Sequence, residues 1–275
     1  MFSDQNKNTQ PPIKDPMPAM QYLIKAFEYC WTNRKDLTAL AFLPVTVLAL
    51  SNTLIAHLYP APIISLTENQ QDFDINHYRL LSVPISLILQ SMFSVALFRY
   101  FLLHEENISI YSALKWNHHK TRFLIRFLQI LGIFALISFA SFTLMGLLSG
   151  ANIGSISGLH IIGFFLLFLV LYAKLMMTLP AAAIGEEMSL KKSWEISTGN
   201  IWRIVAITAL PFIPITIASI IIGNIMTGFF SLEQIVDSLT LKTIYNFVTE
   251  FLSYIYVAVM TVAIGYAYQY LTDDT

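Results

Sequence analysis

Six long apolar runs dominate the sequence, and they limit the folds that this chain can adopt. They cover residues 37–58, 79–103, 123–149, 156–184, 201–228 and 246–271. Each run is near or above the ~20 residues that a helix needs to cross the hydrocarbon core of a bilayer. In lipid, runs of this length satisfy their backbone hydrogen bonds as helices. The sequence therefore predicts an all-α integral membrane protein with six transmembrane helices.

The composition agrees with this class. Of the 275 residues, 56% are hydrophobic and only 12% are charged, whereas soluble domains carry about 25% charged residues. A soluble protein with a large core would still need polar residues to cover its surface. The chain has a single cysteine, Cys30, which excludes an intramolecular disulfide.

Basic residues are distributed unevenly among the connections between the apolar runs. Of the 16 lysines and arginines, all but Arg79 and Lys242 fall in the N-terminal segment or in and beside the second and fourth connections. The positive-inside rule places segments of this kind in the cytoplasm. We therefore expect a multi-pass protein of the bacterial inner membrane with both termini in the cytoplasm.

The polar, proline-rich N-terminus differs in composition from the rest of the chain. It contains no apolar segment that resembles the core of a signal peptide. We predict a disordered cytoplasmic tail over residues 1–18, without a cleavable signal, and a single six-helix transmembrane domain over residues 19–272.

Short amphipathic patterns precede the first, third and fifth apolar runs. Apolar residues at helical spacing form them: Met20, Leu23, Ile24, Phe27, Cys30 and Trp31; then Ile110, Ala113 and Leu114; then Leu190 and Trp194. Ser189 is a candidate N-cap of the last pattern, and Gly199 is a candidate stop. The spacing predicts short interfacial helices that lie in the headgroup plane on the cytoplasmic side.

These segments also resemble one another at constant offsets. Phe27-Glu28, Asn33 and Leu43-Pro44 correspond to Trp194-Glu195, Asn200 and Leu210-Pro211 at an offset of 167, and Glu106 with Ser109 corresponds to Glu186 with Ser189 at an offset of 80. The pattern predicts three repeats of an interfacial helix and two spans, over about 19–104, 108–185 and 188–272. Because each unit has two spans, all three would have the same orientation in the membrane.

Basic and aromatic residues near the cytoplasmic ends of the spans are candidate contacts for anionic lipid. They are Arg99, Lys115, Lys120, Arg122, Lys174, Lys191, Lys192, Trp194, Trp202 and Arg203. Basic clusters beside a membrane attract anionic headgroups. A second interpretation stays open for them, since positive charge also sets topology and the long side chains of Arg99 and Lys174 can snorkel to the interface.

Few other polar residues interrupt the spans. We expect Asn52, Gln90 and Gln129 to form interhelical hydrogen bonds, and Glu250, near the outer end of the last span, to be solvated. Glycines repeat every four residues from Gly146 through Gly150 and Gly154 to Gly158. This repeat predicts close packing of the third and fourth spans.

Catalytic and metal-binding patterns are not found in the sequence. It contains no GxSxG, HExxH, Walker A or GxGxxG pattern in a suitable context. The His118-His119 pair has no third ligand at zinc-like spacing, and the pairs Glu105-Glu106 and Glu186-Glu187 balance nearby lysines. We therefore expect no catalytic residues, no metal, no cofactor and no nucleic-acid partner.

One stretch resembles a bacterial family signature. It consists of Leu179-Pro180-Ala181, Ser189-Leu190, Ser193-Trp194, Gly199-Asn200 and Trp202-Arg203, with Phe98-Arg99-Tyr100 and Arg122-Phe123-Leu124 before it. The chain resembles the membrane domain of some glycerophosphodiester phosphodiesterases and the related YciC-like inner-membrane proteins over most of residues 20–271. The resemblance implies an integral membrane module, but not phosphodiesterase activity, because the catalytic barrel needs about 250 further residues. Lys174 stands where this family often has arginine.

Together these features predict a non-enzymatic bacterial inner-membrane protein with a role in envelope homeostasis. Its expected partners are membrane lipids, and another membrane protein or a second copy of the chain. The alternative is a component of a transporter or flippase for a lipid or small amphiphile. That alternative requires polar residues such as Asn52, Gln90, Gln129 and Lys174 to converge on one cavity near the midplane. A membrane enzyme has the least support.

Overall fold

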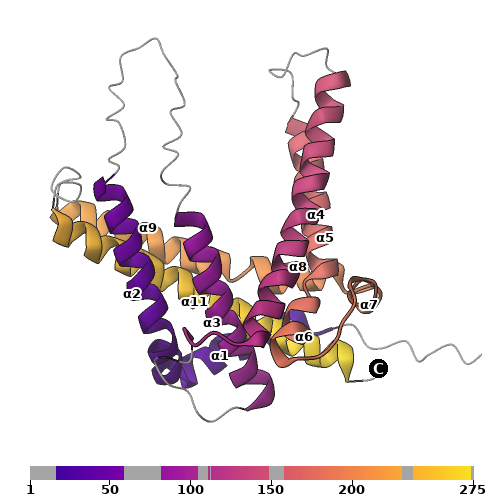
Figure 1. Ribbon diagram of the computed structural model, residues 1–275, viewed down its shortest axis with the longest axis horizontal. Helices are drawn as coiled ribbons and strands as arrows, with labels where there is room; N and C mark the ends of the chain where they lie inside the picture. The colour runs from indigo at the N-terminus through magenta and orange to yellow at the C-terminus, as the bar shows by residue number, and fades with distance from the viewer. Residues whose placement is uncertain are drawn as a thin grey trace, which may run out of the picture.

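The computed structural model describes residues 17–58, 82–104, 111, 113–148, 158–230 and 238–273 (Figure 1). All regular structure in these ranges is helical. The helices are α1 (Ala19–Thr32), α2 (Arg34–Leu58), α3 (Ser82–Leu103), α4 (His118–Leu148), α5 (Gly158–Leu175), α6 (Thr178–Ile184), α7 (Leu190–Ile196), α8 (Ile201–Ala209), α9 (Phe212–Phe229) and α11 (Leu239–Thr272).

Six stretches are long and apolar enough to cross a membrane, and they coincide with the six apolar runs of the sequence. They are Arg34–Leu58, Ser82–Leu103, His118–Leu144, Gly163–Ile184, Ile201–Phe229 and Leu239–Thr272. The prediction of an all-α protein with six such helices is confirmed for the described ranges. The predicted tail lies almost wholly outside these ranges, as do Ile110 and the centre of the glycine repeat.

Two of the six stretches, each predicted as one continuous span, are interrupted by turns. The fourth turns at Met176-Met177 between α5 and α6, and the fifth turns at Leu210-Pro211 between α8 and α9. Proline has no amide hydrogen to donate, so Pro180 and Pro211 each remove a helical hydrogen bond. The Tyr256 hydroxyl donates to the Thr208 carbonyl at 3.1 Å, beside the second turn. A neighbouring helix thus supplies a donor where the helix is broken.

The three amphipathic patterns of the sequence differ in the structures that they form. Residues 19–32 and 190–196 form the helices α1 and α7, as predicted, and the Ser189 side chain caps α7 by accepting from the Lys192 amide at 3.1 Å. Gly199 has a left-handed φ of 88° just beyond α7. In contrast, residues 113–115 form only a turn and a bend.

Helix α11 is the centre of the packing. It contacts α1, α2, α3, α6, α8 and α9. Its C-terminal half buries small and β-branched side chains, among them Ala258, Val262, Ala263 and Ala267. In Figure 1, α2 and α3 stand on the left and the α4–α5 pair stands on the right, while α1, α6, α7 and the C-terminal end of α11 lie on the lower side. Helix α4 joins the core through α3 and α6, and α5 joins it through α8.

Polar residues within the spans pair in two places between α2 and α11. The Asn52 side-chain amide donates to the Glu250 carboxylate at 2.9 Å, and the Asn246 amide donates to Thr53 Oγ1 at 2.9 Å. Glu250, which we expected to be solvated, is half-buried and accepts this bond from Asn52. The interhelical bond predicted for Asn52 is confirmed. Gln129 instead accepts from Arg126 of its own helix at 2.9 Å.

Helices α11 and α3 approach each other closely at Gly265, and this contact gives a stability test. A Cβ atom there would lie 2.6 Å from Cδ1 of Phe101, whose ring is held by edge contacts with Tyr29 and Tyr266 at 5.1 and 4.7 Å. We expect Gly265→Ala to lower the free energy of unfolding in mixed detergent by about 1–3 kcal/mol through overpacking, despite the better helix propensity of alanine.

The matched control for this test is Gly132→Ala in α4, where the new Cβ would have no neighbour within 4 Å. That variant should be as stable as the wild type or slightly more stable. Adding Phe101→Leu to Gly265→Ala should restore part of the lost stability, because it removes the clashing ring. Equal stability of Gly265→Ala and Gly132→Ala would show that the α3–α11 contact is less tight than described.

Candidate functional site

The predicted basic residues meet most closely around the C-terminal end of α6. Two backbone amides, those of Gly185 and Glu186, donate to the Ala181 carbonyl at 3.0 and 2.9 Å. Gly185 has a φ of 93°, and a Cβ atom there would lie 2.9 Å from the His119 ring. Glycine is therefore required twice, for its backbone conformation and for its contact with α4.

Two of the candidate arginines complete this helix end. The Arg122 guanidinium donates to the Gly185 carbonyl at 3.0 Å, and the Arg99 guanidinium reaches the Ala183 carbonyl at 3.5 Å. The last carbonyls of a helix lack intrahelical partners and carry partial negative charge. Arg99 and Arg122 thus fix the end of α6 to α3 and α4.

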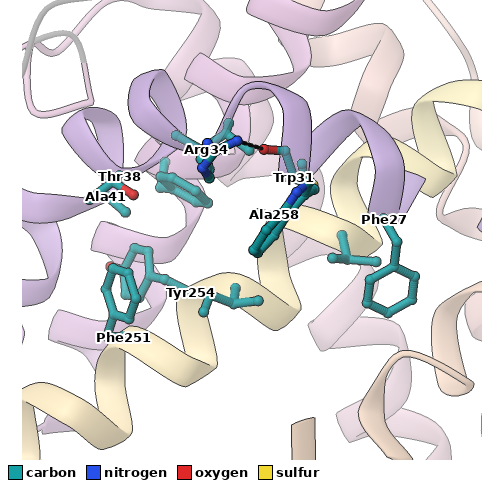
Figure 2. A pocket seen from close by; sticks show the side chains of 13 residues that line it. Phe27, Trp31, Arg34, Thr38, Ala41, Phe251, Tyr254 and Ala258 are labelled. Carbon is teal, nitrogen blue, oxygen red and sulfur yellow. Dashed lines mark hydrogen bonds between the residues drawn. The ribbon is translucent and has the colours of Figure 1, made fainter. Parts of the chain in front are cut away.

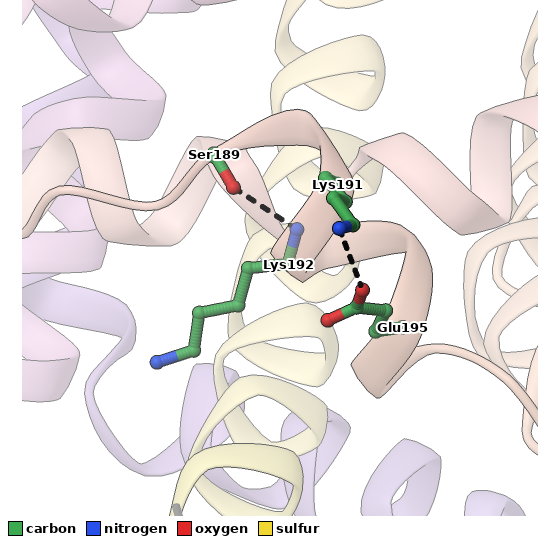
Figure 3. Close-up of polar contacts among 4 residues, drawn as sticks. All are labelled: Ser189, Lys191, Lys192 and Glu195. Carbon is green, nitrogen blue, oxygen red and sulfur yellow. Dashed lines mark hydrogen bonds and ion pairs between the residues drawn. The ribbon is translucent and has the colours of Figure 1, made fainter.

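Helix α7 places two neighbouring lysines on different sides. The Lys191 ammonium pairs with the Glu195 carboxylate at 3.9 Å, and both side chains are exposed. Figure 3 shows the Lys192 side chain extending away from Lys191 and Glu195. Its ammonium makes no hydrogen bond or ion pair with the part of the chain that the structure describes. Lys192 is therefore the lysine of α7 that is available to a ligand.

Lys192 faces a cavity of about 430 Å³, which we call the basic cavity. Its lining residues are Arg122, Arg126, Thr178, Ala182, Glu186, Glu187, Met188, Ser189 and Lys192. The lining carries three cations against two carboxylates, and the Tyr268 hydroxyl donates to one of these carboxylates, that of Glu186. Guanidinium and ammonium groups that line one cavity suit a phosphate or another compact oxyanion. The cavity offers a binding site for an anion rather than a nucleophile paired with a base.

The sequence leaves two interpretations open for Lys174, a contact with anionic lipid or a side chain that snorkels to the interface. In the structure, its ammonium instead binds groups within the protein. Its ammonium donates to Thr198 Oγ1 at 2.6 Å and to the Trp194 carbonyl at 3.2 Å, and it lies 4.8 Å from the centre of the Trp194 ring. The Ser193 hydroxyl donates back to the Lys174 carbonyl at 2.8 Å. With only 5% of its surface exposed, Lys174 ties the end of α5 to α7.

Lys120 has a comparable role in the preceding connection. Its ammonium donates to the carbonyls of Ala113 and Lys115 at 2.6 and 2.7 Å, and the residue is 3% exposed. Both buried lysines therefore hold backbone carbonyls of the connections. Their amines are engaged within the protein.

The other candidate residues lie apart from the basic cavity. Trp194 and Trp202 are 43% and 62% exposed, Lys115 is exposed, and Arg203 contacts the Asn200 side chain at 3.3 Å. Of the ten candidates, the structure brings Arg122 and Lys192 to one cavity and adds Arg126. Arg126 follows Arg122 by one helical turn, a spacing that places both on the same face of a helix.

The comparisons with known proteins bring no identification. No family model matches the chain, and neither does a curated protein or a solved structure. The described fold defines a class, an all-helical chain whose six apolar helices indicate a multi-pass membrane protein. The likeness to the glycerophosphodiesterase membrane domain stays a prediction.

The role of Lys174 can be tested by its removal. We expect Lys174→Met to lower the free energy of unfolding by about 1–3 kcal/mol, because the Trp194 carbonyl and Thr198 would lose a buried charged donor. The control is Lys191→Met, which removes an exposed lysine from the same segment and should leave stability unchanged. Unfolding of both variants in mixed detergent measures the difference. Equal stability would contradict the structural role of Lys174.

Proposed function

We propose that the protein is a non-enzymatic component of the bacterial inner membrane that binds anionic lipid and thereby supports envelope homeostasis. The basic cavity is the main support for this proposal. It joins Arg122 and Arg126 of α4 to Lys192 of α7 beside the end of α6. Lipid phosphates are the anions present in quantity next to such a site. Exposed Trp194 and Trp202 suit the same interface, where aromatic side chains are enriched.

The proposed orientation places the basic cavity at the cytoplasmic surface. The uneven distribution of lysine and arginine supports it, since the basic segments precede α2 and flank α4, α7 and α8. In this orientation α1 and α7 are interfacial helices. The exposure of Met20, Ile24 and Trp31 on α1, at 62%, 49% and 72%, is consistent with contact between this helix and lipid.

Three repeated units remain part of the proposal. Asn33 and Asn200, which are 167 residues apart, both stand between a short helix and a span. Their carbonyls accept from the amides of Leu37 and Ile204 at 3.0 and 2.9 Å, four residues later in each case. This equivalence supports the repeat for the first and third units. The turn at residues 113–115 gives the second unit less support.

The alternative, a transporter or flippase component, has weaker support. It requires Asn52, Gln90, Gln129 and Lys174 to line one path. Three of these side chains instead have separate partners: Glu250 for Asn52, Arg126 for Gln129, and Thr198 for Lys174. We therefore retain lipid binding as the proposed function.

Lipid retention tests the basic cavity. We expect the double variant Arg126→Gln/Lys192→Gln to purify in mild detergent with severalfold less anionic phospholipid than the wild type, as measured by mass spectrometry. Each substitution removes a charged contact to phosphate. Arg122 is left intact because it also holds the Gly185 carbonyl.

The control for lipid retention carries the same loss of charge at exposed positions outside the basic cavity, Lys35→Gln/Lys191→Gln. It should keep the lipid of the wild type. If both double variants lose equal amounts of anionic lipid, only the total charge matters and the basic cavity is not the binding site. If neither loses lipid, the proposed function is wrong.

Membrane orientation has its own test. In a Cys30→Ser background, a cysteine at position 68, in the first connection, and one at position 191, in α7, can each be exposed to a membrane-impermeant maleimide on spheroplasts. We expect Glu68→Cys to react on intact spheroplasts and Lys191→Cys to react only after permeabilisation. The opposite pattern would reverse the topology.

A further inference from the structure

A second cavity lies between α1, α2, α3 and α11, and it shares no lining residue with the basic cavity. It has a volume of about 360 Å³, within the range of about 300–1,000 Å³ typical of small-molecule pockets. The lining is almost entirely apolar and consists of Phe27, Cys30, Trp31, Arg34, Leu37, Thr38, Ala41, Phe93, Phe251, Tyr254, Ile255, Ala258 and Val259. We call it the apolar pocket. Figure 2 shows the side chains of α1 and α2 facing those of α11 across it.

One charged side chain contributes to this lining. The Arg34 guanidinium lies 5.2 Å from the centre of the Trp31 ring and donates one hydrogen bond, at 3.0 Å, to the Trp31 carbonyl. No carboxylate pairs with Arg34 among the residues that the structure describes. A guanidinium has five N–H donors, so most of those on this exposed arginine are available.

The rest of the lining around this charge is mostly apolar. Arg34, Thr38 and Ala41 follow one face of α2, and seven residues of helix span about 10 Å. Phe93 and Tyr254 also line the pocket; each is 1% exposed, their ring centres are 5.0 Å apart, and the buried Tyr254 hydroxyl has no hydrogen-bond partner among the described residues. The pocket therefore combines one cation, which lies between Trp31 and Thr38 in Figure 2, with a mostly aliphatic and aromatic lining.

Charge and polarity together restrict the occupant. A lining that is mostly apolar disfavours strongly polar metabolites, because most of their groups would lose hydrogen bonds to water without replacement. The Arg34 guanidinium, which donates only one hydrogen bond within the described residues, favours an anion beside it. The surrounding surface exposes Ile24, Trp31 and Phe42, and exposed apolar groups on a membrane protein face lipid. The membrane itself is thus the nearest source of a molecule with an anionic head and an apolar chain.

We propose that the apolar pocket holds one acyl chain of an anionic phospholipid, whose phosphate binds Arg34. This inference does not depend on the basic cavity, which uses α4, α6 and α7. It assigns a lipid-binding role to α1, because Phe27, Cys30 and Trp31 of this helix form one wall. The site would hold a single ordered lipid rather than a general layer of headgroups.

Cys30 supplies a reporter inside the pocket, and it is the only cysteine of the chain. Burial raises the pKa of its thiol to about 12, so the reactive thiolate is scarce at neutral pH. Alkylation by N-ethylmaleimide at about pH 8 should therefore be slow and should become faster as the pH rises. An acyl chain in the pocket would slow it further by excluding the reagent.

The experiment compares the alkylation rate of Cys30 in two kinds of lipid nanodisc at one pH. One contains phosphatidylcholine alone, and the other contains an equal mixture of phosphatidylcholine and phosphatidylglycerol. We expect alkylation of the wild type to be about tenfold slower in the mixture, which corresponds to about 1.4 kcal/mol of preference for the anionic lipid. Arg34→Gln should remove this difference. The control Lys35→Gln removes the neighbouring exposed cation, which does not line the pocket, and should behave as the wild type.

A second variant tests separately whether the apolar pocket holds an acyl chain. Ala41→Phe fills the pocket, so alkylation of Cys30 should become insensitive to phosphatidylglycerol even with Arg34 present. The proposal is overturned if the wild type reacts equally fast in both nanodiscs, or if Arg34→Gln keeps the protection. Protection by added oleate without any effect of phosphatidylglycerol would also overturn it, because the occupant would then be a free fatty acid. Loss of lipid from the basic-cavity variants has no bearing on these rates, so the two proposals can fail separately.

Discussion

The need to supply donors for backbone carbonyls governs much of this structure. A continuous helix satisfies its own carbonyls, but every turn at membrane depth or beside the membrane leaves some without partners. Long or aromatic side chains from other helices donate hydrogen bonds to these carbonyls. Lys120 holds two carbonyls of residues 113–115, Lys174 holds the carbonyl of Trp194, and Tyr256 holds that of Thr208. Each of these hydrogen bonds also joins two segments of the chain. The same bonds therefore satisfy backbone carbonyls and hold the fold together.

This requirement changes how the basic residues should be interpreted. Positive charge near the cytoplasmic ends of spans is usually assigned to topology or to lipid headgroups. Here Arg99, Arg122, Lys120 and Lys174 all donate to carbonyls of the chain itself. Among the cations that line the two cavities, Arg126 and Lys192 lie at the basic cavity, and Arg34 lies at the apolar pocket. A count of basic residues therefore overestimates how many cations can bind a ligand. The hydrogen-bond partners of each basic residue show which cations are already engaged within the protein.

The sequence predicted the parts of the fold that depend on local pattern. The apolar runs predicted six helices able to span a membrane, and the Ser189 cap and the helices at 19–32 and 190–196 followed from short-range signals. The turns at Met176-Met177 and Leu210-Pro211 were missed, because hydropathy does not change there although proline interrupts the hydrogen bonds. The partners of Lys174 and Glu250 could not be predicted, since they come from segments 20 and 198 residues away. The place of Arg34 in the lining of the apolar pocket could not be predicted for the same reason, because α11 supplies the opposite wall.

Helix α1 contacts several segments that are distant from it in the sequence. It packs on α11 through the stacked rings of Tyr22 and Tyr266, with centres 5.7 Å apart. The amide of Met17, just before it, donates to the side chain of Asn200 at 3.3 Å, close to α7 and α8. Tyr29 of α1 contacts α3 through Tyr100 and Phe101, and burial there raises the pKa of the Tyr29 hydroxyl. Helix α1 also forms a wall of the apolar pocket. A lipid acyl chain in the pocket would therefore contact the helix whose preceding residue, Met17, binds the connection between α7 and α8. The lipid would thus contribute to the packing of the core as well as cover its surface.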